Sequence, residues 1–532
     1  MGYNMNYRVL VSDPLAEEGI DILREFCDVD VRCDLTEDQI VEIIKDYDAI
    51  LVRSGTMVTA RIIEAGERLK FIGRAGAGVD NIDCDAATRR GIIVANAPEG
   101  NTLAATEHTM AMMLSLARNI PQANSSLKKK EWKRSKFMGI ELNEKTLGIV
   151  GLGRIGREVA KRARAMEMKC VAYDPFISRE RASQVGVELM SLEELFRVSD
   201  VITLHTPLIQ ETYHVINAES IASMKDGVRI INCARGGIID EQALADAVRS
   251  GKVAGAAVDV FEDEPPMNSP LLGLDGVIAT PHLGASTIEA QKNVAVSIAR
   301  QCISVLSGGA AKYVVNAPMV PPEQQEMIEP YARLVEKMGR LLIQLVEGRL
   351  ESIEITYGGE VADMQANTRF ITRIALKGLL DPILQLPVNI VNAEFVARER
   401  GIRVSETLTE EAHGFKNIIT LAVKTDRMTE SVSGSMSGPS RPRIVAIGEY
   451  RTDMTPGGDV VISRHTDKPG VIGRVATILG QVNINIAGMQ VGRNMPGEEA
   501  VMVLNVDSAV PNEAMQQIRQ VDGIKTAKYA KI

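Results

Sequence analysis

The sequence has few aromatic residues and no cysteine pattern of the kind that holds a metal ion. Only 4% of the 532 residues are Phe, Trp or Tyr. The 6 cysteines form no Cys-x-x-Cys pair and no Cys/His cluster at metal-ligand spacing. We therefore expect no metal site, and we interpret the cysteines as reduced thiols of a cytoplasmic protein.

An excess of positive charge and long apolar runs are also missing. There are 60 Lys and Arg against 69 Asp and Glu, so the net charge is −9. Affinity for a nucleic-acid backbone depends on clustered cations, so this balance argues against a nucleic-acid partner. No segment has the apolar length of a membrane span, and Met1 to Arg8 lack the apolar core of a signal peptide. We expect a small-molecule partner.

The chain is long enough for several domains, because single cores stop growing near roughly 250–300 residues. Up to about residue 98, short apolar runs alternate with amphipathic stretches, and the same alternation resumes from 147 to 279. Such alternation predicts βαβ units. We therefore expect an α/β protein with two doubly wound, Rossmann-like domains.

The second series contains six short apolar runs that predict strands. They are 147–150, 170–173, 201–204, 230–232, 256–260 and 277–279. Between the two series, Ala, Met and Leu dominate residues 103–127, which predicts one long helix.

The C-terminal part begins after a proline-dense linker at 316–322. Residues 323–450 contain helix-like and strand-like segments and a polar stretch at 431–440, without a recognisable reactive constellation. From 460 onward the order strand, helix, strand, strand, helix predicts a ferredoxin-like βαββαβ domain.

A glycine-rich turn, Gly151-Leu-Gly153-Arg-Ile-Gly156, lies between an expected strand and an expected helix. The glycines permit a tight turn, and the helix N-terminus presents free N–H groups to a pyrophosphate. A second strand ends at Asp174, where a carboxylate can bind a ribose and repel the 2′-phosphate of NADP. This arrangement predicts an NAD site, against a plain strand–turn–helix.

Three further residues follow later strands and suit the chemistry of a hydroxy acid: Arg235, Glu264 and His282. An imidazole can take the hydroxyl proton, a carboxylate can orient the imidazole, and a guanidinium can hold the substrate carboxylate. Taken singly, each has a simpler explanation: a surface ion pair, a solvated acidic loop and a structural histidine. Spacing alone leaves the choice open.

Taken together, these segments resemble the signatures of the D-isomer-specific 2-hydroxyacid dehydrogenases, and the whole chain is similar to the long members that oxidise 3-phospho-D-glycerate. The segments are 151–156 with Asp174, 232–237, 259–265 and 280–287. The resemblance implies that Arg235 binds substrate, Glu264 tunes the imidazole and His282 is the acid and base. It implies cofactor contacts from Gly151, Gly153, Arg154, Ile155, Gly156, Asp174, Thr206, Cys233, Ala234, Arg235, Asp259, His282, Leu283, Gly284 and Ala285.

The substrate-side residues are expected in the first domain and beside the crevice. Backbone amides of a glycine-containing loop can cradle a carboxylate, and three arginines could reach a phosphate, although each alone is also typical of a surface arginine. The family pattern favours the loop, one arginine and a crevice asparagine. By number, the predicted residues are Arg53, Arg74, Gly76, Gly78, Asn101 and Arg134.

Residues 464–472 and 483–488 resemble an ACT domain, the small effector-binding module of amino-acid metabolism. The resemblance implies that His465, Asp467 and Asn485 meet the amine and carboxylate of an effector, L-serine, across a pair of domains. From the residues alone, a turn capped by Asp467 explains the first segment as well.

The family resemblance implies NAD-dependent oxidation of 3-phospho-D-glycerate to 3-phosphohydroxypyruvate, the first step of L-serine biosynthesis, in a homo-oligomeric enzyme that is a dimer or a tetramer. Two alternatives stay open: another D-2-hydroxyacid dehydrogenase, acting on glyoxylate, hydroxypyruvate or lactate, and an NAD-dependent binding protein without activity. The expected domains are a substrate-binding domain (1–98 and 286–320), an NAD-binding domain (99–285), an intervening α/β domain with a suggested anion site (321–455) and an ACT domain (456–532).

Overall fold

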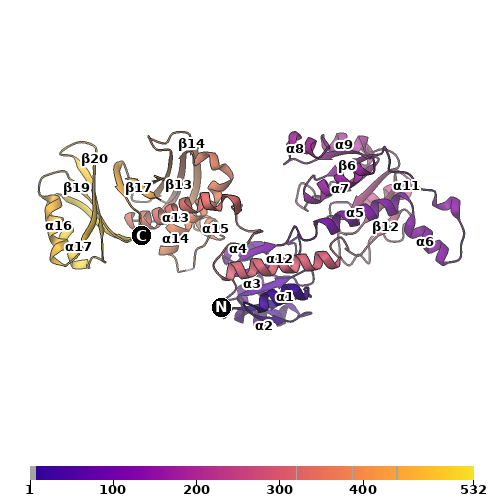
Figure 1. Ribbon diagram of the computed structural model, residues 1–532, viewed down its shortest axis with the longest axis horizontal. Helices are drawn as coiled ribbons and strands as arrows, with labels where there is room; N and C mark the ends of the chain where they lie inside the picture. Colours follow the sequence, from indigo (N-terminus) through magenta and orange to yellow (C-terminus); the bar gives the residue numbers. More distant parts are fainter. Residues whose placement is uncertain (1–6, 319, 321, 386, 439–440) are drawn as a thin grey trace.

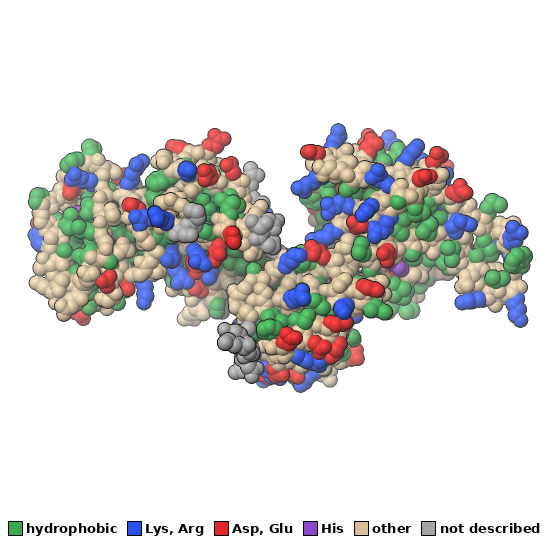
Figure 2. Space-filling view, viewed as in Figure 1, with side chains coloured by type: hydrophobic (Ala, Val, Ile, Leu, Met, Phe, Trp, Pro, Cys, Tyr) green, Lys and Arg blue, Asp and Glu red, His purple; other side chains and the backbone are tan. Residues whose placement is uncertain are grey.

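The computed structural model describes residues 7–318, 320, 322–385, 387–438 and 441–532, and expectations for the remaining positions lie outside these residues. It contains four β-sheets. In Figure 1 the sheets that come first in the chain (indigo to magenta) lie apart from the two that come last (orange to yellow). Basic and acidic side chains are interspersed over the face seen in Figure 2.

The first sheet is parallel, with the strand order β2-β1-β3-β4-β5. Its strands are β1 (Arg8–Val11), β2 (Asp28–Val31), β3 (Ala49–Val52), β4 (Phe71–Arg74) and β5 (Ile93–Asn96). The helical segments between them are α1 (Glu17–Arg24), α2 (Glu37–Ile43), η1 (Ile44–Asp46), α3 (Ala60–Ala65) and α4 (Cys84–Arg89). A later helix, α12 (Ile288–Leu306), returns to this sheet and packs against α1 and β4.

The second sheet is also parallel, with the order β12-β11-β10-β9-β6-β7-β8. The strands are β6 (Thr146–Val150), β7 (Lys169–Tyr173), β8 (Glu188–Leu189), β9 (Val201–Leu204), β10 (Val228–Asn232), β11 (Val253–Val258) and β12 (Val277–Ala279). The helices are α7 (Arg154–Ala165), α8 (Arg179–Gln184), α9 (Leu192–Val198), α10 (Ala218–Ser223) and α11 (Glu241–Ser250). The doubly wound prediction is confirmed, and β8 is one strand more than expected.

The expectation of a single helix over 103–127 is wrong. Two helices occupy this stretch, α5 (Thr102–Ala117) and α6 (Ile120–Lys128). Asn119 between them has φ 51°, in the left-handed region that ends a helix, and Pro121 suits the first turn of the next one. With the short turn η2 (Arg134–Phe137), α6 forms an arm that projects at the right of Figure 1.

The third sheet is mixed, with the order β14-β13-β15-β16-β17-β18. Its strands are β13 (Leu350–Gly359), β14 (Arg403–Thr409), β15 (Asn417–Thr425), β16 (Thr429–Met436), β17 (Pro442–Ile447) and β18 (Tyr450–Met454). Its helical segments are α13 (Pro322–Leu345), η3 (Ala362–Asn367), α14 (Thr368–Leu380), η4 (Asp381–Ile383) and α15 (Ala393–Glu399). The polar stretch from 431 is largely strand β16, in which buried Ser433 pairs with Thr420 of β15 at 2.9 Å.

The fourth sheet confirms the βαββαβ prediction. Its elements are β19 (Asp459–Thr466), α16 (Val471–Gln481), β20 (Ile486–Arg493), β21 (Glu499–Val506), α17 (Asn512–Gln520) and β22 (Ile524–Lys531), and the antiparallel strand order is β20-β21-β19-β22. Val460 and Ile462 share one apolar core with the third sheet. The two C-terminal sheets therefore pack against each other.

Two crossings link the first two sheets. The chain leaves the first sheet after β5 and enters α5, and it comes back from β12 to α12. The part of the chain around the third sheet contacts the part around the first sheet through Asn389, whose side-chain amide donates to the Gly91 carbonyl at 2.7 Å. Among the described helices, none combines the length and apolar character needed to span a bilayer.

Candidate active site

A cavity of ≈ 600 Å³ lies where the carboxyl ends of the two parallel sheets meet. Segments that follow β5, β9, β10, β11 and β12 all contribute to it, in keeping with ligand binding at the carboxyl ends of parallel strands. Of the predicted residues, those lining it are Asn101, Arg154, Ile155, Thr206, Cys233, Ala234, Arg235, Asp259, His282, Gly284 and Ala285. The structure therefore brings half of the predicted catalytic, cofactor and substrate residues together at this cavity.

His282 and Glu264 form a direct pair at this cavity. The Nδ1 atom of His282 lies 2.8 Å from Oε2 of Glu264, and Glu264 Oε1 accepts from the amide of Phe261 at 3.2 Å. Burial alone would raise the pKa of Glu264, but the contacts with His282 and with this amide outweigh burial and lower it. The carboxylate is therefore ionised when it contacts the ring.

Arg235 reaches across the crevice to the first sheet. Its Nε lies 3.1 Å from Oδ2 of Asp80, a residue in the loop after β4, and its Nη1 donates to the Ala234 carbonyl at 2.7 Å. The turn is held by Asn232, whose side-chain amide donates to the Arg235 carbonyl at 2.8 Å. A cation that follows a strand of the second sheet thus faces the loop after β4, which carries the predicted substrate residues Gly76 and Gly78.

Arg74 is a largely buried cation next to this contact. Burial, with the positive charges of Arg235 and Arg53, lowers its pKa to about 10, so the guanidinium is still charged at neutral pH. Its Nε has no hydrogen-bond partner among the described residues. A Cβ at Gly76 would lie 1.6 Å from Nη1 of Arg74, so any side chain there would displace the guanidinium. This group of arginines is suited to an anion.

Arg53 is held by two residues that the sequence analysis did not single out. The carboxylate of Asp13 accepts from the amides of Arg53 at 2.6 Å and Thr56 at 3.1 Å, and the Asn81 side chain donates to the Arg53 carbonyl at 2.7 Å. The sequence signal for Asp13 was its position two residues after the end of β1, at the edge of a parallel sheet where polar residues meet.

The glycine-rich turn leaves room for a dinucleotide. Gly153 is the N-cap residue of α7, and a Cβ built there would meet nothing within 4 Å. The Oδ2 atom of Asp174 accepts from the amide of Leu152 in this turn at 2.8 Å. Thr206 Oγ1 is buried at the cavity and has no partner among the described residues. An open helix N-terminus, an adjacent carboxylate and an orphaned hydroxyl fit a nicotinamide dinucleotide.

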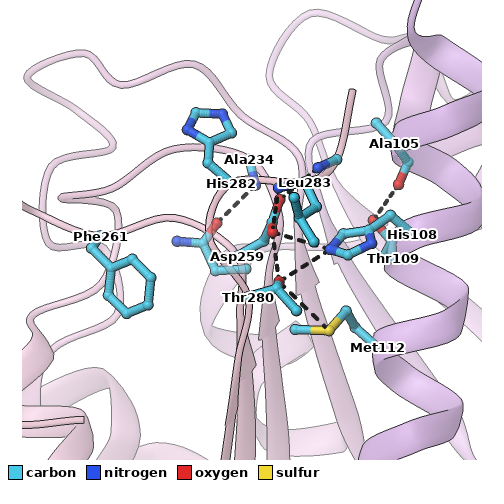
Figure 3. Close-up of polar contacts among 12 residues, drawn as sticks. Ala105, His108, Thr109, Met112, Ala234, Asp259, Phe261, Thr280, His282 and Leu283 are labelled. Atoms are coloured by element: carbon cyan, nitrogen blue, oxygen red, sulfur yellow. Dashed lines mark hydrogen bonds and ion pairs between the residues drawn. The ribbon is translucent and has the colours of Figure 1, made fainter. Parts of the chain in front are cut away.

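Two residues that the sequence analysis missed complete the turn that bears His282. His108 of α5 places Nε2 3.1 Å from Oδ1 of Asp259, and the Thr280 hydroxyl donates to the same oxygen at 2.5 Å (Figure 3). The contact of His108 does not follow from sequence spacing, because His108 precedes Asp259 by most of the domain.

Arg134 does not join the cavity of its own chain. It lies on η2 in the projecting arm, and the cavity lining does not include it. Gly78 lies close to Arg235, since a Cβ at Gly78 would be 2.2 Å from Nη2 of that arginine.

The predicted effector residues lie at two ends of the fourth sheet. His465 pairs with Ala500, which pairs with Arg493, whereas Asn485 precedes Ile486 at the opposite end of β20. His465 is 1% exposed, and its Nδ1 has no partner among the described residues. Asp467 pairs with Arg493 at 2.7 Å, and Asn485 donates to Asp507 at 2.7 Å. One domain therefore does not bring the three residues together.

Comparisons with known proteins agree with this geometry. Residues 110–284 match the NAD-binding domain of D-isomer specific 2-hydroxyacid dehydrogenases, residues 327–448 the D-3-phosphoglycerate dehydrogenase intervening domain, and residues 460–523 the ACT domain. The D-lactate dehydrogenase of Aquifex aeolicus, solved with NAD and lactic acid, is 31% identical with a TM-score of 0.54, and the match covers 59% of this chain and 100% of that one.

Relatives that span the whole chain are more similar. The D-3-phosphoglycerate dehydrogenase of Methanocaldococcus jannaschii is 48% identical over 97% of this chain and 98% of its own length. That of Bacillus subtilis is 45% identical over 98% and 99%. Together with the NAD-binding and intervening-domain matches, these likenesses establish that the chain belongs to the D-3-phosphoglycerate dehydrogenase family.

Proposed function

We propose that the protein oxidises 3-phospho-D-glycerate at C2 with NAD, giving 3-phosphohydroxypyruvate, as the first step of L-serine biosynthesis. The observation that carries the substrate is the half-buried guanidinium of Arg74, whose Nε has no partner among the described residues and which lies near the charges of Arg53 and Arg235. A substrate with a phosphate and a carboxylate adds negative charge to this group of three cations, in which Asp80 pairs with Arg235.

His282 is the base that takes the C2 hydroxyl proton, and the Glu264 carboxylate at 2.8 Å stabilises the imidazolium that results. Arg235 lines the same cavity and holds the substrate carboxylate and the C2 oxygen with its planar fork. To do so it exchanges its contact with Asp80 for the substrate, which carries a similar charge.

Residues 110–284 match the NAD-binding domain of the family, and NAD, when bound there, would accept the hydride that leaves C2. The glycine-rich turn from Gly151 to Gly156 would hold the pyrophosphate, and Asp174 the ribose. Ala285 and Thr206 line the cavity itself. These roles are supported by the open space at Gly153 and the orphaned hydroxyl of Thr206.

Initial rates of NADH formation test the proposal, with 3-phosphohydroxypyruvate trapped as it forms. We expect turnover with 3-phospho-D-glycerate, and kcat/KM at least about 100-fold lower with D-glycerate, D-lactate or glycolate, because these lack the phosphate. Equal or better turnover of an unphosphorylated acid would overturn the substrate assignment. NADH binding without any turnover would indicate a binding protein.

The C-terminal domain supports a regulatory proposal. His465 and Asp467 lie at one end of the fourth sheet and Asn485 at the other, so a serine site with all three requires two copies of the domain. We therefore propose an L-serine effector bound between chains of a homo-oligomer, a dimer or a tetramer. In such an oligomer, Arg134 on its projecting arm would join Arg74 and Arg235 of a neighbouring chain.

Two further assignments complete the proposal. The domain limits are 1–98 with 286–320, 99–285, 321–455 and 456–532, supported by the separate sheets that these ranges contain. A cytoplasmic location is supported by cysteines that are all free in the described structure.

A further inference from the structure

The turn that carries His282 is folded around a buried carboxylate. The side chain of Asp259 is 1% exposed, and its two oxygens accept from the amides of Leu283 and Gly284, each at 2.8 Å. The His282 amide itself donates to the Asp259 carbonyl at 2.9 Å, and His282 has φ 53°. The orientation of the imidazole therefore depends on where this carboxylate is held.

His108 holds the same carboxylate from the opposite side. It belongs to α5, which packs across β10, β11 and β12, and in Figure 3 its ring points at Asp259 and Thr280. Its Nε2 lies 3.1 Å from Asp259 Oδ1 and 3.2 Å from the Thr280 hydroxyl oxygen. The His108 side chain is 18% exposed, so solvent does not readily replace this contact.

The carboxylate needs this set of donors. Burial by itself raises the pKa of Asp259, but the contacts with His108, Thr280 and the Leu283 amide more than offset burial and lower it. Removal of one donor leaves a buried carboxylate oxygen short of a partner, which is costly. The carboxylate then turns towards another donor and moves the two amides that bind it.

We propose that His108 is a positioning residue for the catalytic turn. From α5 it fixes the Asp259 carboxylate, and through Asp259 it fixes the orientation of His282. His108 is not among the described residues that line the cavity, so it acts through Asp259 and does not touch substrate. The inference rests on the proposed function, because it deepens the role given to His282.

The first experiment compares two substitutions at this position. His108→Leu removes the donor at similar volume, and His108→Gln keeps an N–H group at a reach close to that of Nε2. We expect His108→Leu to lower kcat about 10- to 100-fold with KM for 3-phospho-D-glycerate changed less than about threefold, and His108→Gln to recover most of kcat. Glu107→Gln, on the exposed side of the same helix, serves as the control and keeps the kcat of the unsubstituted enzyme.

A second experiment tests whether His108 and Thr280 act on one oxygen. Thr280→Val removes the other side-chain donor to Asp259 Oδ1, which also accepts from the Leu283 amide. Because both residues bind the same atom, we expect the double substitution His108→Leu with Thr280→Val to differ from the sum of the two single effects on log kcat. Thermal unfolding of every variant is measured alongside, so that loss of the fold is separated from loss of turnover.

The inference is overturned if His108→Leu keeps kcat within twofold, or if His108→Gln is as impaired as His108→Leu. Additive effects of the two donors would also overturn it. His282→Asn separates this failure from failure of the proposed function: if His282→Asn retains full turnover, the base assignment is wrong. If His282→Asn is inactive while His108→Leu is fully active, only the positioning role is wrong.

Discussion

The Nδ1 atom of His282 lies 2.8 Å from Oε2 of Glu264, so one ring nitrogen is engaged by a carboxylate and the other is left for the substrate. The pair lies between the loop after β11 and the loop after β12, which are neighbouring strands. Adjacent strands of one sheet thus supply the imidazole and the group that orients it.

Glu264→Gln should move the acidic limb of the pH–rate profile to lower pH. The amide keeps a hydrogen-bond acceptor for the ring but no longer stabilises the protonated imidazole by charge. The pKa of Glu264 is lowered from its ordinary 4.5, so the ionic pairing is present above that value and is lost only as pH falls through the lowered pKa. Values of kcat measured from pH 5 to 9 check this, and an unmoved limb would count against the pairing.

Arg74→Met should raise KM for 3-phospho-D-glycerate about 10- to 100-fold while leaving the unliganded protein at least as stable. The substitution removes both an anion ligand and a half-buried charge whose buried Nε has no partner among the described residues. Steady-state kinetics and urea unfolding measure the two effects. Arg89→Met, at an exposed position on α4, is the control for general loss of positive charge. A marked loss of unliganded stability in Arg74→Met would contradict the prediction.

Gly153→Ala should preserve the fold and weaken NADH binding about 10-fold or more. The added methyl meets nothing within 4 Å in the protein, so it occupies only the space assigned to the pyrophosphate. Fluorescence titration with NADH and thermal unfolding check the two halves. For contrast, Gly156→Ala would place its Cβ 2.1 Å from the Gly151 carbonyl oxygen and should destabilise the domain itself. Normal NADH affinity in Gly153→Ala would place the pyrophosphate elsewhere.

Arg464→Met should destabilise the contact between the two C-terminal sheets by about 3 kcal/mol. The Glu430 side chain is 5% exposed and lies 2.5 Å from Nη2 of Arg464, so removal of the arginine leaves a buried carboxylate unpaired. Glu430→Gln in the same chain should restore part of the loss in urea unfolding. Arg443→Met, which breaks the more exposed pair with Asp453, should cost less than about 1 kcal/mol. Equal effects of the two arginine substitutions would contradict the expectation.

The parallel sheets could be predicted because each buried strand is a short apolar run that alternates along the chain with longer helical stretches, as at 201–204. The break at Asn119 was missed although Pro121, two residues further on, is typical of the first turn of a new helix. Strand β16 was missed because its serines are buried by pairing with β15, so polarity there does not indicate exposure.

The candidate site divides in the same way. Residues that follow strands, such as Arg235 and His282, are visible in sequence because the edge of a parallel sheet gathers them. His108 acts through a contact with a residue distant along the chain, and only the folded structure reveals it. Asp13 was overlooked, although its position shortly after β1 is of the same kind as that of Arg235.

The two crossings between the first two sheets limit how those sheets can move. The chain passes once from β5 to α5 and once from β12 to α12, which packs on the first sheet. Two covalent connections define a line, and rotation about that line is the one large motion that stretches neither connection. Opening and closing of the cavity therefore reduces to a single angular coordinate, along which Asp80 and Arg235 approach or separate.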